Sequence, residues 1–478
     1  MKINKNFLLT GFIFISFLLL PDYSFPQNIN DALRVSIPGL GSSARSIGMG
    51  NSYVALSDDA SAFFFNPAGL GLLKRMEFSG GLDYINFNND ATFFNTKNDY
   101  SNSITKLNNI SFAFPFPTQR GSLVFGLGYQ STHDFTGALK FNAFNSGNNS
   151  KIQDLLVTDV PYDLYLTDEQ NNTIINGMLN QSGDILNSGS LNSWTFSGAI
   201  EVAKNVFVGA NLNILSGVYK ATNNYYEDDT KNIYQDTTAA GEPQTIDFKT
   251  FNLNTVLDWD IEGWNAKVGI LYQFKNFARF GGSIQFPKVI RIKEKFFVDG
   301  LSEFGTGQSY NLDPDKYSDE VEYDIITPFE FTAGFSFNFR GLILSAEGTL
   351  IDYTQMEFEN YNGLTEQYVA DINKEIKDNL APAFNYNFGA EYTIPDLGIR
   401  IRGGYFTQPS AYKADSYDFD RKFVTGGLGF LADETLSLDL AYIYGWWKNI
   451  GDNYGVNVSR TFQDIKYNRL TFSVNYRF

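Results

Sequence analysis

The chain has 478 residues and a net charge of −17, and 16% of its residues are aromatic while 19% are charged. So acidic a chain lacks the basic surface that the phosphate backbone of a nucleic acid requires, which excludes nucleic-acid binding. The sequence contains no cysteine, and this excludes disulfide bonds, thiolate metal sites, a thiol nucleophile and a lipoprotein anchor.

Residues 1–26 have the character of a secretory signal peptide. Lys2 and Lys5 provide a positive start, and a mainly apolar stretch of 14 residues runs from Phe7 to Leu20, ahead of Pro21. This length is too short for a transmembrane helix, which needs about 20 residues, but it suits a signal-peptide core. We therefore expect an exported protein, with retention of the segment as an N-terminal anchor as the less favoured alternative.

A segment without strand periodicity follows, from residue 27 to residue 75. Its central part, from Gly39 to Leu70, is rich in glycine and small apolar residues. Asp58 and Asp59 stand where they can cap a short helix that carries Ala60–Phe64. We expect so apolar a segment to be packed inside the structure that the rest of the chain forms, rather than left as a tail in the periplasm.

From residue 76 to residue 478, apolar side chains alternate with small or polar ones. The clearest runs are Phe329–Phe339, Thr435–Trp446 and Leu470–Phe478. Lipid offers the backbone no hydrogen bonds, so a membrane protein without apolar helices must be a closed barrel, whose strands alternate in this way. We predict an all-β fold, a transmembrane antiparallel β-barrel (residues 76–478) in the outer membrane of a Gram-negative bacterium. Residues 27–75 are then a hatch that plugs its lumen.

Short and long connections alternate between the predicted strands, as periplasmic turns and extracellular loops do in outer-membrane barrels. The short ones are Pro117–Gly121, Ala203–Asn205, Lys275–Phe277, Arg340, Pro395–Leu397 and Ala432–Glu434. The long ones are Asn88–Lys106, Thr132–Asn192, Tyr219–Asp247, Arg291–Thr327, Thr354–Ala383, Gln408–Arg421 and Lys448–Lys466. The alternating runs number 15, whereas a bacterial barrel needs an even count. Reading Phe251–Phe274 as one long, kinked strand gives fourteen strands.

Two features within the barrel sequence could serve a ligand. Glycines often mark bulges, so Gly126 and Gly128 could kink their strand and open the wall, or they could make room for hatch side chains. In the loop Thr132–Asn192, four apolar residues stand at helical spacing, namely Ile174, Ile175, Met178 and Leu179. They predict an amphipathic helix that forms a capture groove, or else packs the loop onto the barrel rim.

The chain ends on an aromatic residue, Phe478, which closes the last alternating run. Such an ending resembles the assembly signal of outer-membrane barrels. We expect the barrel assembly machinery and outer-membrane lipid as partners.

Several motifs resemble the FadL/TodX family of outer-membrane transporters for hydrophobic compounds. They are Asp58-Asp59-Ala60 with Asn66-Pro67-Ala68-Gly69, then Gly263-Trp264-Asn265-Ala266 with Gly269 and Leu271-Tyr272, and Arg402-Gly403-Gly404-Tyr405 with Asp420-Arg421. The resemblance implies fourteen strands, an N-terminal hatch and passive uptake of long-chain fatty acids or aromatic hydrocarbons. It also implies sideways release through a gap in the wall beside the hatch, near Asn66, Pro67 and Ala68. The long outer loops show no such match.

Two other classes of function remain open. PorV-like relatives share a similar hatch signature, which allows a plugged barrel that serves as a secretion or surface-attachment partner. An outer-membrane hydrolase would need His133, the one histidine of the chain, as its base. No nucleophile stands near it in sequence, and we expect a solvated loop histidine. Asp418, Asp420 and Arg421 are expected to pair with one another at a strand start. No cofactor and no metal site are predicted.

Overall fold

The computed structural model describes residues 28–432, 435–452 and 459–478. The predicted signal peptide, residues 1–26, lies outside the described residues, as does most of the turn Ala432–Glu434. Within the described part, no helix is long and apolar enough to cross a membrane.

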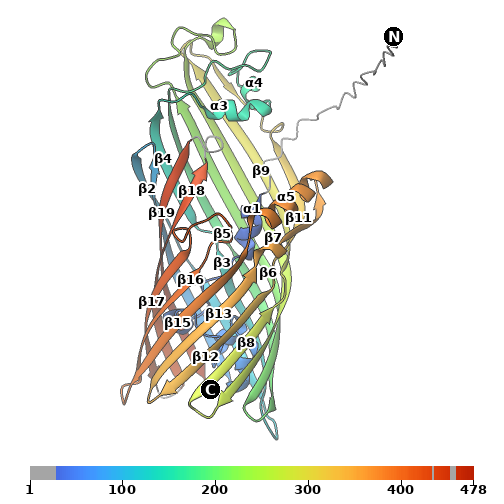
Figure 1. Ribbon diagram of the computed structural model, residues 1–478, viewed down its shortest axis with the longest axis vertical. Helices are drawn as coiled ribbons and strands as arrows, with labels where there is room; N and C mark the ends of the chain where they lie inside the picture. Colours follow the sequence, from blue (N-terminus) through green and yellow to red (C-terminus); the bar gives the residue numbers. More distant parts are fainter. Residues whose placement is uncertain (1–27, 433–434, 453–458) are drawn as a thin grey trace, which may run out of the picture.

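All strands of the described chain belong to one sheet that closes on itself, because β1 and β19 pair from Glu77↔Arg477 to Phe93↔Thr461. Figure 1 shows the resulting tilted cylinder, with short turns and the C-terminus at one end and long extensions at the other. The strands are β1 (Glu77–Phe93), β2 (Thr96–Phe116), β3 (Leu123–Asp134), β4 (Gly137–Asn145), β5 (Leu179–Ala203), β6 (Val206–Asp228), β7 (Phe248–Phe274), β8 (Ala278–Gln285), β9 (Val289–Phe304), β10 (Ser309–Asn311), β11 (Ser318–Ile326), β12 (Glu330–Phe339), β13 (Leu342–Asp352), β14 (Glu357–Asn362), β15 (Pro382–Ile394), β16 (Ile399–Gln408), β17 (Arg421–Ala432), β18 (Leu436–Asp452) and β19 (Arg460–Arg477).

Fourteen strand positions form the closed antiparallel barrel, which confirms the predicted fold class and strand number. β4, β9, β10, β11 and β14 extend the wall above other strands: β9 continues β8, for example, and β11 precedes β12. The predicted merger is confirmed, since β7 is one strand of 27 residues, from Phe248 to Phe274. The expected kink is not in β7, whose register with β6 is unbroken. The break lies instead in the neighbouring wall position, at Phe286–Lys288 between β8 and β9.

The outward faces of the strands carry exposed apolar side chains, among them Phe331, Phe335 and Phe337 of β12, while Ser336 is buried between two of them. Apolar side chains therefore face outward and small or polar ones face the lumen, as a barrel in lipid requires.

Several predicted long loops are in fact extensions of the sheet. β1 and β2 stay paired up to Phe93↔Thr96, joined by a turn in which Phe94 and Asn95 have φ of 42° and 64°. The prediction of a loop over Asn88–Lys106 is therefore wrong. Above the hydrocarbon region the outer face of the strands meets water instead of lipid, so apolar residues are no longer required there although the backbone ladder continues.

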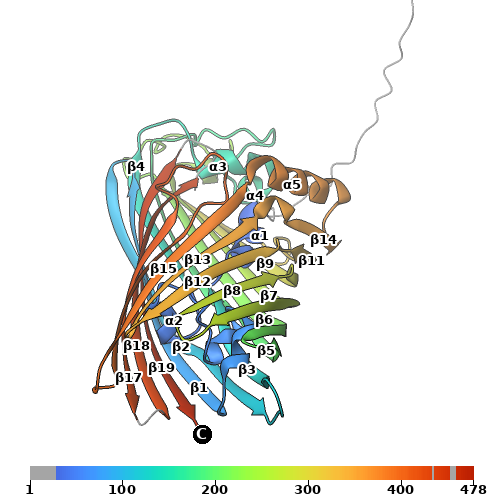
Figure 2. The same ribbon diagram turned by 60° about the horizontal axis from the view of Figure 1, so that its bottom comes forward.

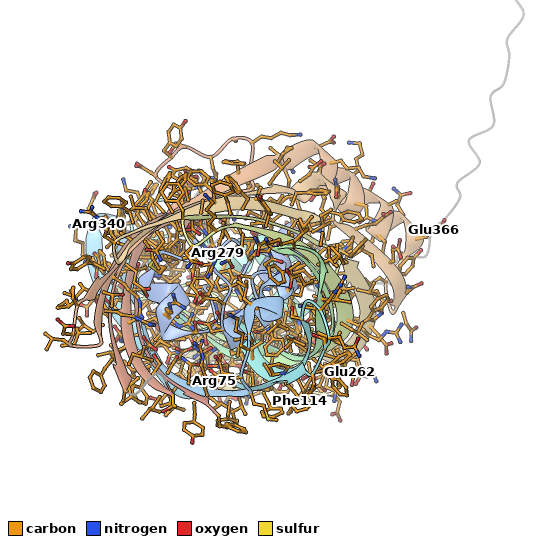
Figure 3. The ribbon with its side chains drawn as sticks, turned by 90° about the horizontal axis from the view of Figure 1, so that it is seen from below. Arg75, Phe114, Glu262, Arg279, Arg340 and Glu366 are labelled. Atoms are coloured by element: carbon orange, nitrogen blue, oxygen red, sulfur yellow. The ribbon has the colours of Figure 1, made fainter. Side chains whose placement is uncertain are left out.

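The N-terminal segment lies inside the cylinder. It comprises α1 (Ile29–Ser36), α2 (Ala44–Gly48), η1 (Ala60–Phe63) and η2 (Pro67–Leu72). Viewed from below, these short helices fill much of the lumen, and Arg279 points toward them from the wall (Figure 3). The predicted cap is present, because the side chain of Asp59 accepts a hydrogen bond from Ser61 N at the start of η1.

The extracellular end is covered by loop elements: α3 (Lys151–Asp154), η3 (Leu155–Val157), α4 (Val160–Asp163) and η4 (Pro243–Thr245). To one side, η5 (Tyr353–Gln355) and α5 (Glu366–Asn379) follow β13 and β14, and α5 lies beside α1 (Figures 1 and 2). Apolar side chains of α1, α5 and the inner wall form one core, which includes Leu33, Trp259 and Ile372.

Candidate functional site

Asn66 fastens the lower hatch to the wall. Its side-chain amide donates hydrogen bonds to Val54 O within the hatch (2.9 Å) and to Ile270 O of β7 (3.0 Å). Its side-chain oxygen accepts from Ala68 N, 3.1 Å away, and so caps η2. One fully buried side chain therefore closes the hatch turn, starts the next helix and ties both to the barrel.

Pro67 and Ala68 lie flat against the wall because glycines face them. A Cβ on Gly209 of β6 would sit 2.5 Å from the carbonyl carbon of Pro67, and one on Gly269 of β7 would sit 1.9 Å from Asn66 Oδ1. The three hatch residues predicted from the family motif thus lie together at β6 and β7. Their role in a ligand's path stays a prediction.

A buried network of charges anchors the other side of the hatch. Arg45 of α2 pairs with Glu391 of β15 (3.1 Å) and with Asp58 of the hatch (2.5 Å). Glu391 also accepts from Arg402, 2.6 Å away, and Arg402 reaches Asp439 on β18 at 2.5 Å. Removing one partner of such a network leaves an uncompensated buried charge, at a cost of about 3–5 kcal/mol. The hatch is therefore a firmly docked part of the fold.

Gly126 and Gly128 face the lumen, not a gap. β3 keeps its register with both β2 and β5 through these positions, so the expectation of a kink there is wrong. The ring of Phe63 occupies the space, since a Cβ on Gly126 would sit 2.4 Å from its Cζ and one on Gly128 would sit 3.4 Å from its Cδ2. The contacts match the second reading, room for hatch side chains.

The four apolar loop residues do not form a helix. Gly177 and Met178 have φ of 139° and 55°, which interrupts any helical turn. Ile175 and Leu179 are fully buried in the core of the extracellular cap, whereas Ile174 and Met178 are exposed. The helix prediction over Ile174–Leu179 is therefore wrong, because a glycine within the spacing pattern permits a turn instead. A capture groove at these residues stays a prediction.

Above the hatch the lumen opens into a cavity of about 870 Å³. Pro38, Gly39 and Leu40 of the hatch lie along it, and one side is formed by the upper parts of β2 and β3. Its aromatic lining consists of Phe87, Phe135, Tyr219, Tyr353, Tyr412, Phe419, Phe423, Trp447 and Tyr467. A space of this size, with mixed aromatic and charged walls, suits a ligand with an apolar body and a polar head.

Arg421, at the start of β17, contributes a positive charge to this cavity. The sequence did not predict this position. The expected pairing with its neighbours is wrong: Asp418 pairs with Lys448 (3.0 Å), and Asp420 accepts a hydrogen bond from Ser410 N. The guanidinium of Arg421 lies instead over the ring of Trp447, 5.1 Å from its centre. Within the part of the chain that the structure describes, no carboxylate pairs with Arg421.

Two other cations of the cavity are neutralised by carboxylates. Lys106 pairs with Asp134 at 2.7 Å, and Arg469 pairs with Asp83 at 2.8 Å. His133 is on β3 and lines the same cavity, so the expectation of a solvated loop histidine is wrong. The sequence gives only a weak indication that Arg421 and Lys106 line a cavity. The ends of long strands that face the cavity are as polar in sequence as an exposed loop.

The family model described as outer membrane protein transport protein (OMPP1/FadL/TodX) matches residues 41–477. The chain belongs to this family. It is an outer-membrane β-barrel of Gram-negative bacteria and a channel for hydrophobic compounds, not an enzyme.

Solved structures agree with this membership at the level of the fold. A FadL homologue from Pseudomonas aeruginosa is 12% identical, covers 93% of this chain and 100% of its own, and superposes with a TM-score of 0.57. The toluene transporter TodX from P. putida is 13% identical over 92% of this chain and 99% of its own, with a TM-score of 0.55. The toluene transporter TbuX from Ralstonia pickettii is 16% identical over 92% and 99%, with a TM-score of 0.51. No curated protein sequence matches the chain.

Proposed function

We propose that this FadL/TodX family member takes up long-chain fatty acids, or closely similar acidic amphiphiles, by passive diffusion. The observation that carries the proposal is the guanidinium of Arg421, which faces a ligand-sized cavity without a carboxylate partner among the described residues. A carboxylate head group supplies the missing anion in a charge-assisted hydrogen bond. A neutral hydrocarbon does not.

The rest of the cavity suits the apolar body of such a ligand. Phe87, Phe135, Phe423 and Trp447 line it, and Phe423 stacks on Phe406 with ring centres 4.4 Å apart. An acyl chain that packs against these side chains is removed from water, which stabilises the bound state by roughly 25 cal/mol for each Å² of apolar surface buried. The ligand is thus held at one end by charge and along its length by apolar contact.

The hatch supports a sideways release. The straight route to the periplasm is filled by packed residues such as Tyr53, Phe63 and Leu70, all of which are buried, and buried charges anchor them to the wall. A ligand that leaves through the wall avoids moving the hatch and enters the membrane directly. This release beside the hatch is what the family resemblance implies.

Uptake in a deletion strain tests the proposal. Cells that carry the wild-type gene should accumulate radiolabelled oleate faster than cells without it, and Arg421→Gln should lose most of the gain while Arg421→Lys keeps part of it. Uptake of labelled toluene should respond weakly to either change. Equal oleate uptake with and without the gene would contradict transport, and would favour the alternative of a secretion or surface-attachment partner.

A further inference from the structure

The barrel wall is much taller on one side than on the other. β5, β6 and β7 have 25, 23 and 27 residues, and at about 3.3 Å per residue and a tilt near 40° they rise roughly 60 Å. On the opposite side, β16 and β17 have only 10 and 12 residues. They rise roughly 25–30 Å, about the thickness of the hydrocarbon layer. Residues 409–420 join β16 to β17, and we call this loop the rim.

Aromatic side chains on the outer face place the rim at the membrane surface. Lys422, close after the rim, pairs in register with Trp446 of β18. The next residue, Trp447, lines the cavity, so Trp446 points outward, and its ring stacks on that of Tyr444 with centres 5.8 Å apart. Outward aromatic residues form the girdles that mark the boundary between hydrocarbon and head groups. The rim therefore lies at about the level of the lipid head groups.

The cavity opens over this low side of the wall. Among its described lining residues, the exposed ones are Asn30, Asp415, Lys448, Asn449 and Ile450. One belongs to the rim, three to the upper end of β18 beside it, and one to α1. The lining residues that β1 to β6 contribute are all buried or half-buried. In Figure 1, α1 is seen on this side, between β18 and α5.

Hydrogen bonds hold the rim from both flanks. Lys448 N of β18 donates to Asp418 O at 2.9 Å. On the other flank, Ala381 N donates to Ala411 O at 2.9 Å, which ties the rim to the chain between α5 and β15. The low side of the wall is therefore a built feature of the fold.

Two aromatic residues of the rim have opposite surroundings. Tyr417 lies outside the cavity and is 85% exposed, whereas Phe419 is half-buried and lines the cavity. A tyrosine at the membrane surface places its ring against lipid and its hydroxyl in water. Arg421 follows directly after the rim and also lines the cavity. An acidic amphiphile that crosses the rim thus meets an interfacial tyrosine, then a phenylalanine, and then the guanidinium group.

We propose that the ligand enters the cavity sideways from the outer leaflet of the membrane, across the rim, and that Tyr417 lies among the lipid head groups. This inference rests on the proposed function for the nature of the ligand, and it adds where the ligand comes from. The apolar chain of a fatty acid drives it out of water and into lipid. The outer leaflet is then its reservoir, and the low side of the wall is a short way from there to Arg421.

A measurement without a ligand tests the position of the rim. The sequence contains no cysteine, so Tyr417→Cys can carry a single NBD fluorophore in proteoliposomes whose phosphatidylcholine bears a nitroxide on its head group. The matched control is Val157→Cys in η3 of the extracellular cap, where the native side chain is 89% exposed. We expect strong quenching at Tyr417→Cys and little at Val157→Cys. Equal quenching of the two would overturn the placement of the rim, whatever the substrate is.

A second experiment tests the entrance. A bulky polyethylene-glycol maleimide on Asp415→Cys should cover the mouth, so that cells lose most of their uptake of radiolabelled oleate relative to unmodified Asp415→Cys. The same reagent on Val157→Cys should leave uptake unchanged. Equal losses from the two labels, or a loss from the cap label alone, would overturn the side entrance and leave transport standing. Failure of the wild type to take up oleate would contradict the proposed substrate, and the quenching would then decide the rim by itself.

Discussion

The ring of Phe63 in η1 lies over Gly126 of β3, so closely that a Cβ atom at position 126 would sit 2.4 Å from Phe63 Cζ. The ring of Phe63 therefore packs closely against the wall only because residue 126 is a glycine and has no side chain. The same device recurs at Gly209 against Pro67 and at Gly281 against Val54. Plugging the lumen depends on shape as well as on charge.

Gly126→Val should loosen the hatch. The added side chain overlaps Phe63, and such overpacking typically costs about 1–3 kcal/mol. We expect a higher single-channel conductance in planar bilayers and a greater sensitivity of cells to large antibiotics, with the barrel still folded.

Phe63→Ala combined with Gly126→Val provides the control for this effect, because it removes the ring that the introduced valine side chain would strike. The double variant should leak less than Gly126→Val alone. Additive leakage in the double variant would show that the overlap is not the cause.

Asn66 performs two tasks, and one pair of variants separates them. Asn66→Asp keeps the oxygen that caps η2 at Ala68 N but loses the amide that donates to Val54 O and Ile270 O. Asn66→Ala loses both. Because buried carbonyls left without a donor cost about 1–3 kcal/mol, we expect both variants to lower the thermal unfolding temperature of the purified barrel. A near wild-type Asn66→Asp would assign the role to the cap.

The sequence predicted the fold correctly in the parts of the chain where contact with lipid constrains the residue pattern. Outside the barrel the solvent is apolar, so alternation survives in runs such as Leu470–Phe478, and the need for an even strand count correctly merged Phe251–Phe274 into β7. The hatch was also readable, because an apolar stretch without strand period has to be buried somewhere, and Asp59 marks a cap.

The rest depends on relationships that no local pattern encodes. Above the membrane, β1 and β2 continue as a polar ladder up to Phe93 and Thr96, and their sequence reads as loop. The spacing of Ile175 and Leu179 predicts a helix, but the backbone between them forms a turn, and both side chains are buried without a helix. Arg421 and Lys106 line the same cavity only once strands far apart in sequence close the barrel.

The extracellular cap should respond to pH through Glu227. This residue is near the top of β6, more than 20 residues from the turn at Asn205. At about 3.3 Å per residue and a tilt near 40°, it stands roughly 50 Å above that turn, beyond the ~30 Å hydrocarbon layer. Its side chain accepts from Lys151 N and Gln181 Nε2, both at 2.7 Å. Burial raises the pKa of Glu227 to about 7, from an ordinary value of 4.5.

A carboxyl whose pKa is raised in the folded state stabilises that state most at low pH, and the contribution is lost as pH rises from about 4.5 through about 7. A shift of this size corresponds to at most about 3 kcal/mol. Limited proteolysis of the extracellular loops should therefore be faster at pH 8.5 than at pH 5.5, and Glu227→Gln should remove the difference. A pH response that survives in Glu227→Gln would have another origin.

The central claim is that Arg421 holds the acidic head of an amphiphilic ligand inside the cavity. Isothermal titration of purified protein with oleate, and with a neutral eighteen-carbon alkene as the matched ligand, tests it directly. Arg421→Gln should weaken oleate binding by about tenfold or more, equivalent to roughly 1.4 kcal/mol, and leave the alkene unaffected. An Arg421→Gln variant that binds oleate as tightly as the wild type would contradict the account.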